Sequence, residues 1–530
     1  VKVKQIIYNI MAPQQEDTTS AGLPKSRSMF FTTEPLVETP TSTHSRFAGR
    51  QPAGTSRPVT VAKNGVRHIR RFDGQEKEIM AIGLACSEVF SGPRLAKVLR
   101  PGLMYEQEIY QKLLDDQYAA PLSIHTSAGV TDSLAQFLDA LEPHLPWPEK
   151  KNLDWCVSLQ LEGASAVMAA VDMCLQTQMI DTGNNHRKMV AVASTSYHGP
   201  PSTSFGSKTP LWTKTYQVKY PSPVAGEEVV IADFVQRFEQ WLDKHGEEVG
   251  VMLIEPQWGS MQCALPWPKE LLKTYVKMAQ GRGIKVISDE IMCGIGRHGM
   301  GTMFVAEAWE LDVDAITFGK AISAGVFPLS GAILKTGRDI LSGAGRSVMQ
   351  SHTFAGANAR SLITGAMVLN ELPKWFDSIS KLGQEMTHIF RALEKESKGM
   401  IICHGQGLMW GGLFTKTDQN TDENYRAESV QCFKKNCDDV GVLPYHTPVG
   451  GFMVSPVVDI DVGTVYEFGE KLQEAVRRTV EDRGWNDVTI KREEVISLQE
   501  DFAEFASTVK CDPSLHLTRS CTSCNSFVCQ

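Results

Sequence analysis

The sequence has no run of about 18 consecutive apolar residues, which is the length that a helix needs to cross a bilayer. Basic residues are not in excess, because 53 Lys and Arg stand against 61 Asp and Glu, for a net charge of -8. No long basic run and no internal repeat occurs. We therefore expect no membrane span and no nucleic-acid partner. The 530 residues, 42% of them hydrophobic, predict a soluble globular protein with a large core and two or three domains.

The two ends of the chain have little of the patterning that predicts structure. The stretch from Pro13 to about Val61 is dense in Ser, Thr, Pro and Gly and shows no helical or strand period, so we expect residues 1–65 to be a disordered arm. The first residues, VKVKQIIYNIM, carry two lysines but no small-residue cleavage site follows, so we expect no signal peptide.

The cysteines are numerous but do not form a disulfide pattern. Of the twelve, eight are scattered between Cys86 and Cys437, which is typical of reduced thiols in a cytoplasmic protein. Four more lie in the last twenty residues, where Cys521-x-x-Cys524 resembles half of a zinc site. Because no matching half follows, we expect residues 491–530 to be a free tail without a metal.

Between the ends, short apolar runs alternate with helical or loop stretches. The runs that predict strands are Met189–Ala193, Val251–Ile254, Lys285–Ile287, Ala315–Phe318 and Leu329–Leu334. Helices are predicted before them and between them, with Asp132 and the box Thr464-x-x-Glu467 as expected caps. The alternation predicts an α/β fold with a mostly parallel sheet in residues 66–370. Residues 371–490 predict a smaller α+β domain.

An acid and a lysine stand at the ends of two predicted strands. Asp289 follows the run Lys285–Ile287, and Lys320 follows Ala315–Phe318 after Gly319. Ligands of parallel sheets bind at the carboxyl ends of the strands. A lysine amine can form a Schiff base with pyridoxal 5'-phosphate (PLP), and a carboxylate can keep the pyridine nitrogen protonated. Most acids and lysines at strand ends are solvated charges, so this interpretation needs support from the rest of the chain.

Other stretches supply that support by their order. The small-residue stretch Glu162-Gly163-Ala164-Ser165-Ala166 opens a predicted helix, whose free N–H groups suit a phosphate. Ser196-Tyr197-His198-Gly199 places an aromatic ring near a strand end. Ile254-Glu255-Pro256 ends another strand, and Ser351-His352-Thr353-Phe354-Ala355-Gly356 offers a hydroxyl.

Taken together, the order EGASA, YHG, EP, DEIMCGIGRHG, GK, HTFAG resembles the class III (ω-type) aminotransferases of fold type I, over about residues 66–485. The stretch DEIMCGIGRHG is the most specific part, and the 31 residues from Asp289 to Lys320 also fit. The resemblance implies a PLP-dependent homodimer with active sites shared between subunits, acting on an amine donor and a carbonyl acceptor.

The resemblance also implies roles for individual residues. Lys320 would be the Schiff-base lysine and general base, and Asp289 the partner of the pyridine nitrogen. Tyr197 would stack on the ring. The backbone of Gly163 and Ala164 would hold the phosphate, together with the hydroxyl of Thr353 from the neighbouring subunit.

Several positions depart from the family pattern. Where the family has Ser-Gly-Ser/Thr-Glu-Ala, this chain has Glu162 and Ala164, so a phosphate-binding hydroxyl is lost and an acid is added; Ser165 is a candidate to compensate. Met292 stands where many members have Gln, and His404 where they have Arg. Met453 stands where many members carry an Arg that grips a carboxylate, which removes about 1.5–3 kcal/mol of charge-assisted bonding. We therefore expect an amine, or an amino acid bound in another way, rather than a standard 2-oxoglutarate-using enzyme.

The motifs do not distinguish every reaction of this scaffold. Transamination is the main interpretation. An aminomutase, a racemase, a decarboxylase or a carbon–carbon bond-forming enzyme would need the same Asp289 and Lys320. A catalytically silent PLP-binding protein is a further alternative, against which the intact pair argues.

Overall fold

The computed structural model describes residues 59–64, 66–72, 75–83, 86–117, 129–147, 155–183, 186–199, 217–335, 358–414 and 423–485. The chain divides into two compact units, Val1–Ala81 and Ile82–Gln530. None of the helices within the described ranges combines the length and the hydropathy that a bilayer crossing requires.

The first unit contains an antiparallel meander. Its strands are β1 (Val59–Asn64), β2 (Arg67–Phe72) and β3 (Gln75–Ala81), with Val61 opposite Ile69. Within the described residues, a strand is present from Val59, inside the stretch 1–65 for which composition predicts a disordered arm. The reason is local, because the run Val59-Thr60-Val61 is β-branched and favours a strand. Residues 1–58 lie outside the described ranges.

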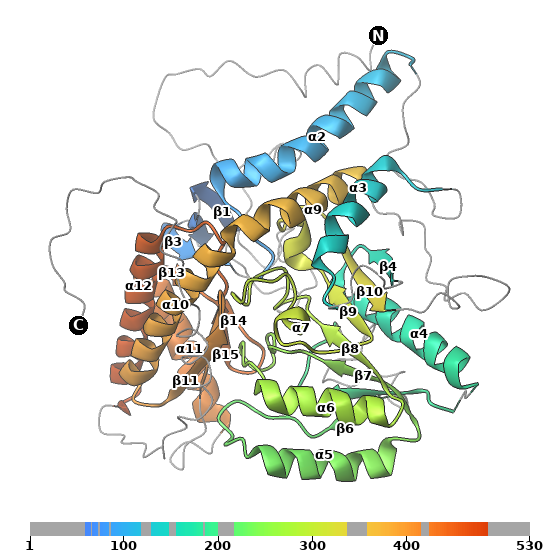
Figure 1. Ribbon diagram of the computed structural model, residues 1–530. Coiled ribbons are helices and arrows are strands. Elements are labelled where there is room, and N and C mark those ends of the chain that lie inside the picture. Colours follow the sequence, from blue (N-terminus) through green and yellow to red (C-terminus); the bar gives the residue numbers. More distant parts are fainter. Residues whose placement is uncertain are drawn as a thin grey trace, which may run out of the picture. The chain divides into compact units, whose positions relative to one another are not determined.

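The second unit is organised around a seven-stranded sheet with the order β4-β10-β9-β8-β7-β5-β6 (Figure 1). Its strands are β4 (Trp155–Gln160), β5 (Met189–Ala193), β6 (Gln217–Tyr220), β7 (Val249–Ile254), β8 (Lys285–Asp289), β9 (Ala315–Phe318) and β10 (Ser330–Lys335). All neighbours in the run from β9 to β6 are parallel, whereas β10 is antiparallel to both β4 and β9. The mostly parallel α/β sheet predicted from the sequence is therefore confirmed.

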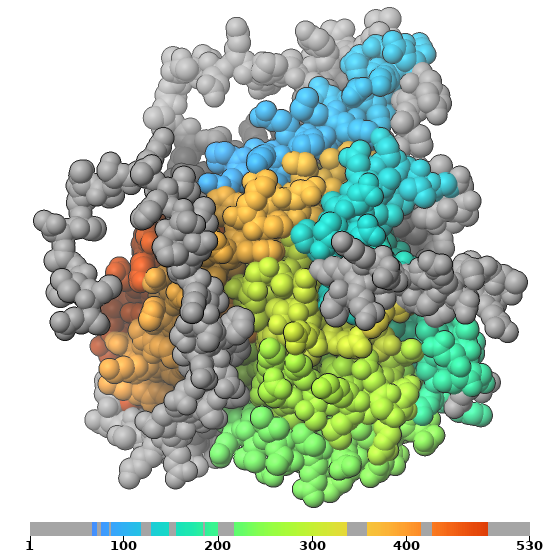
Figure 2. Space-filling model, viewed as in Figure 1, coloured from blue at the N-terminus to red at the C-terminus, as the bar shows by residue number. Residues whose placement is uncertain are grey.

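Helices pack beside this sheet. They are α2 (Gly92–Leu114), α3 (Asp132–Leu141) with the 3₁₀ turn η2 (Glu142–His144), α4 (Gly163–Thr182), α5 (Ile231–His245), α6 (Lys269–Gly281), the short α7 (Val305–Ala308), the 3₁₀ turn η5 (Lys320–Ser323) and α9 (Ala359–Glu371). Helix α9 packs against α2 and α3. Helix α2 forms part of the surface shown in blue in Figure 2.

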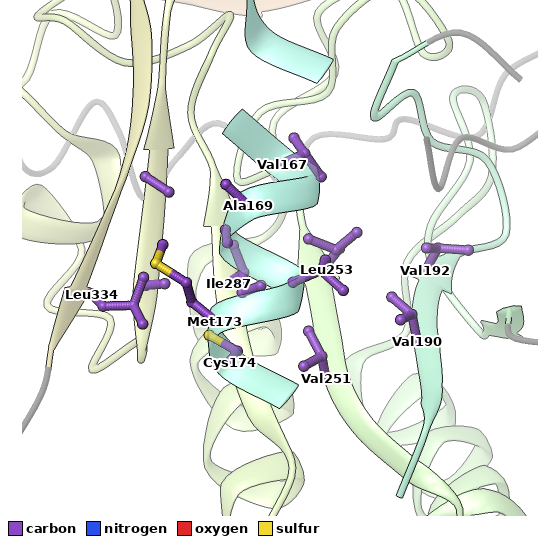
Figure 3. Packing of buried hydrophobic residues seen from close by; sticks show 14 residues of the cluster. Val167, Ala169, Met173, Cys174, Val190, Val192, Val251, Leu253, Ile287 and Leu334 are labelled. Carbon is purple, nitrogen blue, oxygen red and sulfur yellow. The ribbon is translucent and has the colours of Figure 1, made fainter. Parts of the chain in front are cut away.

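The core lies between α4 and one face of the sheet (Figure 3). Helix α4 is apolar on most sides, and its residues Val167 and Met173 pack with Leu253, Ile287 and other strand residues of the same cluster. A helix that is apolar all round is buried, which accounts for the placement of α4 against the sheet. On the opposite face, Phe137 of α3 lies 6.3 Å from Phe318 of β9, between ring centroids. Both faces of the β9–β10 region are thus covered.

A smaller α+β domain follows. It contains the 3₁₀ turn η6 (Leu372–Trp375), α10 (Phe376–Glu396), β11 (Ile401–Gln406), β12 (Met409–Phe414), α11 (Glu423–Val440), β13 (Val442–Leu443), β14 (Tyr445–His446), β15 (Gly451–Val454) and α12 (Val462–Asp482). Strands β11-β12-β15-β14 form an antiparallel sheet. Phe452 of β15 packs against Phe433 of α11 and Phe390 of α10, so the helices cover one face of this sheet.

Two predicted helix caps were wrong. Helix α3 is capped by Thr131, whose Oγ1 accepts from the N–H of Leu134, whereas Asp132 already lies in the helix and accepts from the hydroxyl of Tyr105. Helix α12 is capped by Asp461, which accepts from the N–H of Thr464 at 2.9 Å. In both cases another residue able to cap precedes the predicted one, and its extended backbone makes it the cap.

Candidate active site

The predicted site residues of the described chain gather at one edge of the large sheet. Strands β7, β8 and β9 are parallel and end at the same edge, where Asp289 closes β8 and Lys320 follows β9. The register pairs Asp289 with Thr317, so the acid and the lysine leave adjacent strands at nearly the same level. Tyr197 follows the end of β5, and Gly163 begins α4 after β4. Thr353, the predicted partner-chain hydroxyl, lies outside the described residues.

Asp289 is held by three hydrogen bonds and is 6% exposed. Its Oδ1 accepts from Thr317 Oγ1 at 3.0 Å and from the N–H of Ile291 at 3.3 Å. Its Oδ2 accepts from His198 Nδ1 at 2.7 Å. Each oxygen of an ionised carboxylate can accept about two hydrogen bonds, so Oδ2 has room for one more donor. A protonated ring nitrogen at this edge would be such a donor.

His198 is the residue that the sequence interpretation did not assign. It is 2% exposed, and its Nε2 is buried without a hydrogen-bond partner in the described chain. Burial by itself lowers the pKa of His198, but the hydrogen bond and charge of Asp289 outweigh burial and raise the pKa above 6.5. His198 therefore stabilises the Asp289 carboxylate and fixes its orientation. A signal for it is present in the sequence, because His198 directly follows Tyr197 in the motif Ser196-Tyr197-His198-Gly199.

Glu255 fixes the segment that carries Tyr197. Its Oε2 accepts from the N–H of Tyr197 at 3.1 Å, and its Oε1 accepts from the N–H of Gly259 at 3.1 Å. Burial raises the pKa of Glu255 to about 7, against the lowering effect of His198 and of the two N–H donors. The Tyr197 side chain is 37% exposed, so its ring is accessible at the edge of the sheet. The backbone is therefore anchored while the ring stays available to a ligand.

The chain turns sharply where Lys320 begins. Gly319 is extended, with φ -177°, and Lys320 opens the 3₁₀ turn η5 with φ 45°. A positive φ is uncommon for a residue with a side chain, and such residues are enriched at active sites. The turn lifts Lys320 out of the direction of β9, at the edge where Asp289 lies.

The start of α4 is the candidate phosphate cup. The first N–H groups of a helix have no intrahelical acceptor, and Glu162, the N-cap, does not accept from them with its side chain. A Cβ built on Gly163 would lie 2.9 Å from Cδ1 of Ile291, so the absence of a side chain lets Ile291 pack closely against the start of α4. Ser165, the candidate to replace the hydroxyl that Ala164 lacks, donates from its Oγ to Glu162 Oε1 at 3.3 Å.

The most specific sequence stretch has largely a structural role. Glu290, beside Asp289, accepts from the N–H groups of Val305 and Ala306 at 2.6 and 2.8 Å and so begins α7. Arg297 donates to the carbonyl oxygens of Pro456 and Glu88 at 2.9 and 2.6 Å. These contacts lie away from the ring site and hold its supporting loop in place.

The predicted departures in the small domain are buried beside the loop that follows β7. His404 Nε2 donates to the carbonyl oxygen of Gln262 at 2.6 Å, and burial lowers the pKa of His404 to about 4. Met453 is 2% exposed and lies opposite Gly411, where a Cβ would meet the carbonyl oxygen of Cys263 at 2.2 Å. This face of the small sheet therefore packs tightly on the loop. Neither side chain supplies a cation at neutral pH.

The residues at this edge fit PLP. Asp289 has an oxygen for a protonated ring nitrogen, Lys320 is the amine at the neighbouring strand end, and α4 offers unused N–H donors. A large, mostly parallel sheet with these residues at the carboxyl ends of its strands, followed by a smaller α+β domain, is the fold of type I PLP-dependent enzymes.

The chain belongs to the class-III aminotransferases, because the model of that family, Aminotransferase class-III, matches residues 110–459. Over 32% of its length it is 30% identical to an adenosylmethionine-8-amino-7-oxononanoate aminotransferase of Helicobacter pylori, covering 39% of that protein. An acetylornithine aminotransferase of Caldanaerobacter subterraneus is 25% identical over 47% of this chain and 60% of the relative. The chain thus matches less than two thirds of the length of these relatives.

The fold is also similar to a solved structure. Taurine:2-oxoglutarate aminotransferase of Bifidobacterium kashiwanohense, in complex with PLP and glutamate, superposes with a TM-score of 0.67. The match covers 83% of this chain and 97% of that chain at 15% identity, so the likeness concerns the fold.

Proposed function

We propose that this protein is a PLP-dependent aminotransferase that uses Lys320. The observation that carries the proposal is the pairing of β8 with β9, which brings Asp289 and Lys320 to adjacent strand ends. Asp289 is buried there and accepts three hydrogen bonds. Family membership supports the same reaction. We propose a cytoplasmic location as well, which the scattered spacing of the cysteines between Cys86 and Cys437 supports.

Each side chain has a separate task in this proposal. Bound PLP supplies an aldehyde carbon for the amine and a ring that accepts electrons from the substrate carbon. Asp289 Oδ2 holds the proton on the ring nitrogen, and His198 and Thr317 keep the carboxylate in position. Lys320 Nζ would hold the cofactor at rest and, once released, would take a proton from the substrate carbon and deliver it to the cofactor carbon. Tyr197 covers one face of the ring.

The substrate proposal follows from Met453. A buried methionine offers no charge-assisted bond to a carboxylate. His404, on the other side of Gly411 in the same sheet, is neutral at pH 7 because burial lowers its pKa to about 4. We therefore propose an amine donor, or an amino acid whose carboxylate binds elsewhere, together with a carbonyl acceptor.

We further propose that the protein is a homodimer, to which Thr353 would contribute from the partner. Helix α2 carries five large hydrophobic side chains that are at least a third exposed: Leu103, Met104, Tyr110, Leu113 and Leu114. An apolar surface of this extent supports association. Sedimentation of the purified protein would show a dimer, and a monomer at micromolar concentration would contradict this proposal.

The visible absorbance of the protein with added PLP tests the function. The wild type should gain the absorbance of a lysine-bound cofactor, and Lys320→Ala should not. Lys335→Ala is the matched control, since Lys335 ends the antiparallel strand β10 at the opposite edge and pairs with Asp312. A wild type that gains no such absorbance would contradict PLP binding.

A donor screen then tests the reaction. Transamination predicts that nitrogen leaves an amine donor and appears on a carbonyl acceptor in equal amounts. If the donor's stereocentre is inverted and no nitrogen is transferred, the enzyme is a racemase. If carbon dioxide is released from the donor, the enzyme is a decarboxylase. Either result would replace the transaminase proposal while keeping the PLP site.

A further inference from the structure

The cap of α4 has its two residues in reverse order. A capping box has Ser or Thr at the N-cap and Glu three residues later. Here Glu162 is the N-cap and Ser165 is the residue three positions on. The Glu162 carboxylate is exposed and accepts from Ser165 Oγ at 3.3 Å rather than from a backbone N–H. The Glu162 side chain therefore does not cap the helix N–H donors, and its negative charge stands beside them.

A buried hydroxyl lies at the same edge. Ser330 is 1% exposed, and its Oγ has no hydrogen-bond partner among the described residues. Ser330 pairs with Gln160, the last residue of β4 before the chain enters α4. Its side chain is on the α4 side of the sheet, because Ala332 and Leu334 of the same strand face pack in the cluster with α4.

Two glycine positions and the side chain of Ile291 connect Ser330 with the start of α4. A Cβ built on Gly319 would lie 3.3 Å from Cβ of Ser330 and 3.4 Å from Cγ2 of Ile291. The Cβ of Gly163 would also touch Ile291, at 2.9 Å. Ile291 therefore contacts both the start of α4 and the residue before Lys320. Ser330 lies beside that contact.

The Ser330 hydroxyl and the N–H groups at the start of α4 suit a phosphate, whereas the Glu162 carboxylate would repel it. A buried hydroxyl without an acceptor is unfavourable, so its presence points to a ligand oxygen. Helix N–H donors and the helix dipole favour the same anion. A carboxylate at the N-terminus already interacts with the dipole and repels a phosphate dianion.

We propose that Ser330 donates to the cofactor's phosphate in place of the hydroxyl that Ala164 lacks, and that Glu162 opposes the phosphate. This inference rests on the proposed function. The two residues thus set, in opposite directions, how strongly the protein prefers PLP over pyridoxal, which lacks only the phosphate.

The test is to titrate the full-length apoprotein with PLP and with pyridoxal, and to measure both dissociation constants. Ser330→Ala should weaken PLP binding by about 10-fold or more, as expected for a lost hydrogen bond to a charged group. Glu162→Gln should strengthen PLP binding by roughly 3-fold to 10-fold at low salt, with the gain shrinking as salt screens the charge. Pyridoxal affinity should change less than about 2-fold in both variants.

Two variants serve as controls. Ser158→Ala removes a buried serine on the same face, but its Oγ already accepts from Gln160 at 2.9 Å, so the PLP-to-pyridoxal ratio should stay unchanged. Asp172→Asn removes an exposed acid of α4 that is about 14 Å farther along the helix. The melting temperature of each apoprotein shows whether it folds, and Ser330→Ala should melt at the same or a higher temperature than the wild type.

The outcomes separate the two proposals. If Ser330→Ala weakens PLP and pyridoxal equally, or Glu162→Gln leaves the ratio unchanged, this inference is overturned while PLP binding stands. If the wild type binds neither ligand, the proposed function itself is wrong.

Discussion

Replacing His198 tests the support of Asp289. The pair is buried, with side-chain exposures of 0% and 6%, and its atoms are 2.7 Å apart. His198→Ala leaves a buried carboxylate without its shortest hydrogen bond, so the free energy of unfolding should fall by about 3–5 kcal/mol. Urea denaturation followed by circular dichroism measures this loss, and PLP affinity should fall with it.

The loss should also depend on pH. The pKa of His198 is raised in the folded protein, so its stabilising contribution is fully present below 6.5 and disappears as the pH rises through the folded pKa. His198→Ala should therefore cost more at about pH 6 than at about pH 9. His198→Asn is the matched control, because its amide nitrogen can take the place of Nδ1 and should recover part of the loss.

Two results would contradict this role of His198. If His198→Ala destabilises the protein by less than about 1 kcal/mol at pH 6, the pair does not support Asp289. Equal losses for His198→Ala and His198→Asn would show that the ring's packing, rather than its hydrogen bond, is what matters.

Two further predictions concern the small domain and its loop. Burial lowers the pKa of His404 to about 4, so the free energy of unfolding of the wild type should fall by up to about 3 kcal/mol as the pH falls from 6.5 toward 4. His404→Gln keeps a donor to Gln262, and its urea midpoint should change less with pH over this range. An equally steep change in the variant would contradict the assignment. Gly411→Ala places a Cβ 2.2 Å from the carbonyl oxygen of Cys263 and should lower the free energy of unfolding by about 2–3 kcal/mol. The control Gly281→Ala, whose Cβ would meet nothing within 4 Å, should leave the protein as stable or more stable in the same assay. Equal effects of the two substitutions would refute the tight packing at Gly411.

Periodicity predicted the sheet because each strand leaves its own local signature. The apolar runs at Met189–Ala193 and Ala315–Phe318 are β5 and β9, with the predicted bounds. β4 was not predicted, since Trp155–Gln160 contains Ser and Gln within a buried strand. The antiparallel direction of β10 was also missed, because direction depends on connections and not on composition.

The site was predicted as separate residues but not as a bonded network. The order of motifs indicated Asp289, Lys320, Tyr197 and Gly163, which now lie at one edge of the sheet, while their roles remain proposals. The bond between His198 and Asp289 joins residues 91 positions apart, so no local pattern reports it. The buried hydroxyl of Ser330 became visible only when the strand register placed it beside α4.

The most direct test of the account is to locate the cofactor's covalent attachment. Borohydride reduction of the PLP-loaded protein fixes the bond between cofactor and lysine, and peptide mass mapping identifies the modified residue. The account predicts one modified peptide, with the added mass on Lys320 and none in Lys320→Ala. Modification of a different lysine, or of none in a protein saturated with PLP, would contradict it.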